Sequence, residues 1–162
     1  NPKLIKNFNS KKINDNLFIQ NEHLSSNDVK ILIIGCGLSI SYDCYLGDKC
    51  DLEDKYKIDH NDKKVLTIDM EPYVSPHLLT YINPADSRII EYLLENFPNI
   101  KYIIYDGIKI PHTYDMFSKI TKNIFLFGCD GFNHIIEQNT SGMFVYGKSV
   151  ISVYLSNYDI KF

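Results

Sequence analysis

Apolar and polar residues follow one another along this chain in blocks. The block at 29–34 is almost entirely β-branched or aliphatic, which is typical of a strand that is buried on both faces. Similar blocks lie at 64–68, 78–82, 100–105 and 123–127. Because strands of this kind belong to parallel sheets covered by helices, the pattern predicts an α/β fold.

A helix is predicted between the third and fourth of these blocks, with Asp86 or Ser87 as its N-cap and Pro98 beyond its end. Its apolar face is expected to consist of Ile89, Ile90, Leu93 and Leu94. A second, shorter helix is predicted over 112–120. Helices that alternate with strands in this way connect parallel strands, which supports the parallel sheet.

The C-terminal part of the chain holds two further β-type blocks, at 143–146 and 149–155, on either side of Gly147 and Lys148. Two such blocks around a short turn predict an antiparallel hairpin. We therefore expect a Rossmann-like three-layer α/β sandwich, with a mainly parallel sheet and an antiparallel C-terminal hairpin.

The 162 residues are expected to hold one domain, over 29–162. Residues 1–28 are polar and are predicted to be an N-terminal extension, with a short apolar segment that packs on the domain edge. That segment consists of Ile13, Leu17, Phe18 and Ile19. Residues 43–63 carry seven acidic side chains among lysines, and we interpret them as a solvated insertion. Their acids lack the alternating spacing and central glycine of a calcium loop.

Composition narrows the class of protein. Hydrophobic residues make up 44% and charged residues 23% of the chain, which is globular composition. No apolar run approaches the roughly 20 residues that span a bilayer, and the N-terminus lacks the apolar centre of a secretory signal. We therefore expect a cytoplasmic protein with no membrane partner. The spacing of the four cysteines matches no common zinc site, so no metal is expected.

The charge of the chain bears on its partners. A net charge of −3 argues against a general nucleic-acid binder. The lysines of the N-terminal extension are compatible with an anionic partner such as RNA, although a solvated tail is the simpler interpretation. They are Lys3, Lys6, Lys11 and Lys12. A protein partner is the alternative that the sequence leaves open.

Residues suited to ligand binding follow the ends of several predicted strands. They are Gly35, Cys36 and Gly37 after the first strand, Asp69 after the second, Asp86 past the third and Asp106 after the fourth. In open parallel sheets, ligands bind beyond the carboxyl ends of the strands. Glycines let the backbone turn sharply and approach a ligand, and carboxylates accept hydrogen bonds from ribose hydroxyls. The arrangement predicts a pocket for an adenosine-containing cofactor.

The segment 33–39, which contains this glycine turn, resembles the glycine motif of class I S-adenosylmethionine-dependent methyltransferases. The resemblance extends over residues 29–130 and implies S-adenosylmethionine as the cofactor. The implied contacts are Gly35, Cys36 and Gly37 beside the methionine part, Asp69 beside the ribose and Asp86 beside the adenine. Two features depart from the family: Ser39 stands where a third glycine is frequent, and no family motif follows the fourth strand.

Methyl transfer depends mainly on in-line positioning of the nucleophile, and a general base helps when the nucleophile is protonated. Asp106 is the best candidate for a catalytic base or for orienting the methyl acceptor, whose identity the sequence does not indicate. Two alternatives stay open. The missing fourth-strand motif favours a catalytically inactive, methyltransferase-like structural or regulatory domain. An NAD-type Rossmann enzyme is disfavoured because Ile40 stands at the third glycine position of the dinucleotide fingerprint.

Overall fold

A computed structural model describes residues 11–35, 59, 61–106, 111–127, 144–146, 155, 156 and 158–161 of the chain. Its strands are β1 (Lys11–Asn14), β2 (Leu17–Ile19), β3 (Ile31–Ile34), β4 (Val65–Asp69), β5 (Leu78–Thr80), β6 (Tyr102–Asp106), β7 (Ile124–Phe127) and β8 (Phe144–Tyr146). Its α-helices are α3 (Ser87–Asn96) and α4 (Pro111–Phe117), and its short 3-10 helices are η1 (Ser26–Asp28) and η4 (Pro72–Val74). The strand and helix assignments made from the sequence between residues 29 and 127 are confirmed within a few residues at each end.

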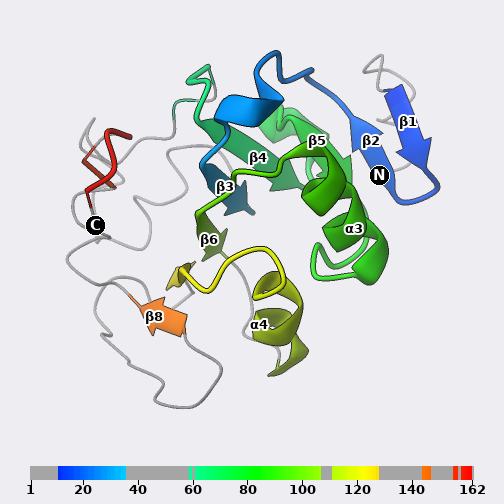
Figure 1. Cartoon of the computed structure of the whole chain (residues 1–162). Coiled ribbons are helices and arrows are strands. Elements are labelled where there is room, and N and C mark those ends of the chain that lie inside the picture. The colour runs from blue at the N-terminus through cyan, green and yellow to red at the C-terminus, as the bar shows by residue number, and fades with distance from the viewer. Residues whose placement is uncertain are drawn as a thin grey trace, which may run out of the picture.

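The strands form one mixed sheet in the order β1-β2-β5-β4-β3-β6-β7-β8 (Figure 1). Pairing is parallel from β5 through β8, whereas β1–β2 and β2–β5 are antiparallel. The chain is therefore an α/β protein, as the blocks of apolar residues predict. The sheet runs from β3 outward in both directions, because β4 lies on one side of β3 and β6 on the other.

The hydrophobic core lies between the sheet and the two α-helices. Leu32 and Leu66 from the central strands belong to the same buried cluster as Leu93 of α3 and Phe117 of α4. The side chains that alternate with these along the strands, such as Ile31, are also fully buried. Both faces of the central strands are therefore covered, as expected for unbroken apolar blocks.

The N-terminal residues contribute more to the sheet than their polar composition suggests. β1 and β2 form an antiparallel hairpin that extends the sheet beyond β5, with Leu17 opposite Thr80. Leu17 is fully buried, which confirms the predicted packing of this segment on the domain edge. Residues 43–58 and residue 60 of the acidic insertion lie outside the described residues.

Of the predicted antiparallel C-terminal hairpin, only the first strand lies among the described residues, as β8. β8 pairs with β7 in parallel, with Ile124 opposite Phe144, and the antiparallel strands lie at the other edge of the sheet. A parallel crossover needs about a dozen residues or more, and the sixteen residues 128–143 between the two strands meet that length. Residues 149–154 of the expected hairpin lie outside the described residues, and Leu155 has a left-handed backbone conformation with a φ of 47°.

α3 confirms the predicted helix with one exception. Asp86 is its N-cap, and Ile89, Ile90 and Leu93 are buried. Leu94 is 42% exposed, because it lies at the border of the face that the other three define. Within the part of the chain that the structure describes, no helix combines the length and apolar character needed to cross a bilayer.

Candidate functional site

Three of the candidate residues lie at one level of the sheet. Ile34 pairs with Ile68 of β4 on one side and with Tyr105 of β6 on the other. The next residue of each strand is Gly35, Asp69 or Asp106, so these positions stand side by side at the carboxyl edge. Adjacent strands are about 4.8 Å apart, which places both acidic positions next to the glycine.

Gly35 makes the turn that the sequence predicts. Its φ is 72°, in the left-handed region that favours glycine, and its N–H donates to the carbonyl of Ile68 at 2.8 Å. A side chain at this position would add a Cβ where the chain leaves the sheet. Cys36 and Gly37, the other two residues of the turn, lie outside the described residues.

Asp69 ends β4 and is 8% exposed. Its Oδ1 accepts hydrogen bonds from the N–H groups of Met70 at 2.7 Å and Glu71 at 3.0 Å. The carboxylate thus holds the backbone as it turns away from the sheet. A carboxylate is also the type of acceptor that a ribose hydroxyl requires. The backbone of Asp106 ends β6, and its side chain lies outside the described residues.

Asp86 has a clear role in the helix that follows it. Its Oδ1 accepts from the backbone N–H of Arg88 at 2.9 Å and from Arg88 Nε at 2.8 Å, and its Oδ2 accepts from the guanidinium at 2.9 Å. These hydrogen bonds lower the pKa of Asp86 to about 2. The hydrogen bond and charge of Lys12 lower the pKa of Asp15, in the turn between β1 and β2, and the charge of Arg88 adds a smaller effect in the same direction. Asp86 is therefore a helix cap near the hairpin edge, and an adenine amine would have to share a carboxylate that Arg88 already binds.

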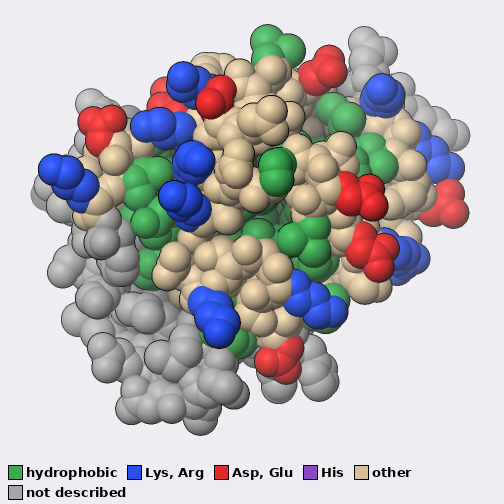
Figure 2. All heavy atoms as spheres, in the orientation of Figure 1, with side chains coloured by type: hydrophobic (Ala, Val, Ile, Leu, Met, Phe, Trp, Pro, Cys, Tyr) green, Lys and Arg blue, Asp and Glu red, His purple; other side chains and the backbone are tan. Residues whose placement is uncertain are grey.

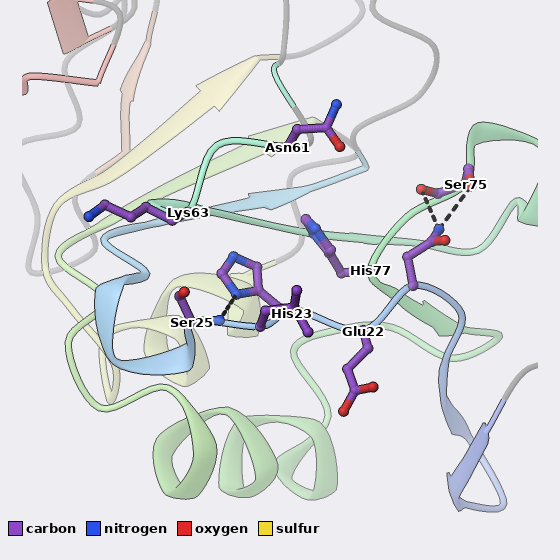
Figure 3. A pocket seen from close by; sticks show the side chains of 9 residues that line it. Glu22, His23, Ser25, Asn61, Lys63, Ser75 and His77 are labelled. Carbon is purple, nitrogen blue, oxygen red and sulfur yellow. Dashed lines mark hydrogen bonds between the residues drawn. The ribbon is translucent and has the colours of Figure 1, made fainter.

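The described residues also enclose a hollow at the opposite, amino edge of the sheet (Figure 3). Its volume is about 590 Å³. Its walls come from the segment between β2 and β3, the residues before β4 and the residues before β5. They are Asn21, Glu22, His23, Leu24, Ser25, Asn61, Lys63, Ser75 and His77. A second hollow of about 210 Å³ shares four of these residues and reaches the apolar side chains of Leu66 and Phe97.

Two histidines organise this region. His77 Nδ1 accepts from the backbone N–H of Thr67 at 3.0 Å, while the His77 N–H donates to Thr67 Oγ1 at 3.0 Å. His77 thereby ties the start of β5 to β4. The ring of His23 lies 4.9 Å from that of His77, and its Nδ1 accepts from the N–H of Ser25 at 3.1 Å.

Both rings accept hydrogen bonds at Nδ1, which favours the neutral tautomer with the proton on Nε2. Burial lowers the pKa of His23, and the Val65 backbone and the charge of Asp28 act in the opposite direction. No motif in the sequence marks this pair, because the two histidines stand singly and far apart in the chain.

Within the described ranges, no three histidine, cysteine or acidic residues form a group that could hold a metal ion. The hollows described here lie at the amino edge, and the ligand site at the carboxyl edge, at Gly35 and Asp69, stays a prediction from the sequence. Comparisons of the chain with models of protein families, with curated proteins and with solved structures gave no match.

Proposed function

We propose that this chain binds S-adenosylmethionine at the carboxyl edge of its sheet and transfers the methyl group to an acceptor. The observation that carries the proposal is the common level of Gly35, Asp69 and Asp106 on β3, β4 and β6. In open α/β sheets, ligands bind where neighbouring strands connect in opposite directions, and β3 and β6 form such a point here.

The described residues fit this cofactor in part. Gly35 leaves room for close approach of a ligand, and Asp69 supplies a largely buried carboxylate beside it for the ribose hydroxyls. A contact of Asp86 with adenine would have to share the carboxylate with Arg88, which binds both of its oxygens. When bound, the cofactor supplies an activated methyl group. The role of Asp106 in orienting or deprotonating the acceptor is part of the proposal.

The proposal includes a Rossmann-like arrangement in three layers. Burial of both faces of the central strands supports it, since one face packs against α3 and α4 and the other is equally inaccessible. The parallel strands follow the order β5-β4-β3-β6-β7-β8. That order is the doubly wound one.

A second candidate, an NAD-type dinucleotide-binding domain, gains support from one observation. The sixth parallel strand, β8, completes the strand order that dinucleotide-binding domains use. The position of Ile40 disfavours this candidate, as the sequence analysis states.

Calorimetric titration with S-adenosylmethionine, S-adenosylhomocysteine and NAD tests the proposal. We expect the first two ligands to bind and NAD not to bind. Asp69→Asn is the informative variant, because its amide oxygen can still accept from Met70 and Glu71 while the charge and one acceptor are lost. It should weaken binding at least tenfold, the effect of losing a charge-assisted hydrogen bond.

Asp62→Asn is the matched control. Asp62 lies just before the amino end of β4, where its Oδ1 accepts a hydrogen bond from the backbone N–H of Lys64 at 2.8 Å. This variant should bind both methionine ligands as wild type does. Binding of NAD alone would favour the second candidate. A folded chain that binds none of the three would contradict both and favour a domain without a cofactor.

A further inference from the structure

The amino edge of the sheet, opposite the proposed cofactor site, carries a row of lysines. Lys64, Lys30 and Lys101 directly precede β4, β3 and β6, which are neighbours in the sheet. Their backbones are joined, since the Lys30 N–H donates to the Lys64 carbonyl at 2.9 Å and the Lys101 N–H donates to the Lys30 carbonyl at 2.8 Å. With a strand spacing of about 4.8 Å, the three Cα atoms span about 10 Å. Lys63, the residue before Lys64, belongs with these three, and we refer to the four residues as the lysine row.

Each of the three lysines stands one residue before a set of strand positions that are in register, namely Ile31, Val65 and Tyr102, so their backbones lie side by side at the amino edge. Figure 2 shows Lys and Arg side chains gathered over the start of β4, β3 and β6. Within the described part of the chain, Lys30 and Lys101 form no ion pair with a carboxylate. Lys64 is partly engaged, because its Nζ donates to the Tyr158 carbonyl at 2.8 Å and lies 3.9 Å from Asp159.

Acidic residues also lie close to the row in the sequence, namely Asp28, Asp59 and Asp62. Two of them are committed to local turns: Asp59 Oδ1 accepts from the N–H of Asn61 at 2.9 Å, and Asp62 Oδ1 accepts from that of Lys64. The edge is therefore moderately basic, in a chain whose net charge is −3. A polyanion would bind here through a few contacts and with a marked dependence on salt.

The lysine row continues into the hollow of about 590 Å³, because Lys63 belongs to both. The hollow offers the amide group of Asn61, the half-buried ring of His23 and the carboxylate of Glu22 (Figure 3). The amide nitrogen of Asn21 already donates to Ser75 and Pro76. Unstacked RNA bases are recognised by stacking on aromatic side chains, histidine included, and by hydrogen bonds to their edges. A cationic row that opens into a polar, partly aromatic hollow therefore suits a nucleotide chain better than a flat lipid surface, which offers no base.

We propose that the amino edge binds single-stranded RNA, with phosphates along Lys63, Lys30 and Lys101 and one base in the hollow beside His23. This inference is independent of the proposed cofactor site, because it concerns the opposite edge of the sheet. It also differs from an RNA contact through the N-terminal lysines, which include Lys11 and Lys12 on β1.

Fluorescence anisotropy with a labelled 12-nucleotide single-stranded RNA of mixed sequence tests the proposal on the full chain. Three phosphate contacts predict a slope of about −2 for log K against log salt, and hence a loss of affinity of about 15- to 20-fold between 50 and 200 mM salt. The double variant Lys30→Gln/Lys101→Gln should move the slope toward zero by about 1.4. The control Lys11→Gln/Lys12→Gln removes the same charge from β1 and should leave the slope unchanged.

An abasic strand of the same length separates the base from the phosphates. We expect the abasic strand to keep the same salt slope. Its affinity should be at least about fivefold lower, as the loss of one stacked base predicts. Circular dichroism confirms that each variant is folded. The RNA site is refuted if wild type does not bind at 50 mM salt, if the two double variants behave alike, or if anionic phosphatidylserine vesicles bind through the lysine row and RNA does not. Equal affinity for the abasic strand overturns the placement of a base in the hollow.

Discussion

The pairing of Thr67 with His77 leads to a sharp prediction about stability. Thr67 is fully buried in β4, and its Oγ1 accepts the His77 N–H at 3.0 Å and contacts His77 Nδ1 at 3.1 Å. Thr67→Val keeps the shape of the side chain and removes the acceptor. The His77 N–H, in a residue only 7% exposed, then loses its partner.

A buried donor without a partner costs about 1–3 kcal/mol, so we expect the free energy of unfolding to fall by about 2 kcal/mol. For a chain of this length, that corresponds to a decrease in Tm of about 4–8 °C. The assay is urea unfolding followed by circular dichroism at pH 7.5, with thermal unfolding as a second measurement. The slope against urea should not change, because the surface exposed on unfolding is the same.

Thr80→Val in the neighbouring strand is the matched control. Thr80 is also buried, but among the described residues its Oγ1 makes only long hydrogen bonds within its own turn, at 3.3 Å from Ile82 N and 3.4 Å from Ile82 O. We expect a loss below about 1 kcal/mol. Equal losses in the two variants, or no loss in Thr67→Val, would refute the view that Thr67 and His77 together fasten β5 to β4.

Three further predictions address other parts of the molecule. Burial lowers the pKa of His23, so the unfolded state binds a proton at a higher pH than the folded state does. The free energy of unfolding should therefore fall as the pH drops below 6.5, the ordinary pKa of histidine. Urea titrations of His23→Gln should show a smaller fall. Asp86→Ala should cost about 1 kcal/mol through loss of the α3 cap. Because the pKa of Asp86 is about 2, the difference in the free energy of unfolding between Asp86→Ala and wild type should be complete above pH 4 and vanish as the pH falls toward 2. Phe117→Ala should cost about 3–5 kcal/mol in urea unfolding and Leu94→Ala about 0.5 kcal/mol, because the first side chain is fully buried and the second is 42% exposed.

Local patterns were sufficient to predict the centre of the fold. The apolar blocks and the spacing of Ile89, Ile90 and Leu93 depend on burial against near neighbours, so their sequence carries the information directly. The glycine turn could be predicted for the same reason, since a positive φ at Gly35 favours a residue without a Cβ.

Features that depend on distant parts of the chain could not be predicted in this way. The parallel pairing of β8 with β7 depends on contacts between separate segments, and the addition of β2 to β5 joins segments about sixty residues apart. The histidine pair arises from the meeting of the segments before β3 and β5, so neither histidine stands out alone. Asp86 was assigned two roles from the sequence, and the Arg88 contacts bear out only the helix cap.

The most direct test of the proposed cofactor site is a map of amide chemical shifts on titration with S-adenosylhomocysteine. The proposal predicts that the largest changes occur at Gly35 and in the Asp69, Met70 and Glu71 turn, at the carboxyl edge of β3 and β4. Changes confined to His23 and the other residues of the amino-edge hollow would contradict it.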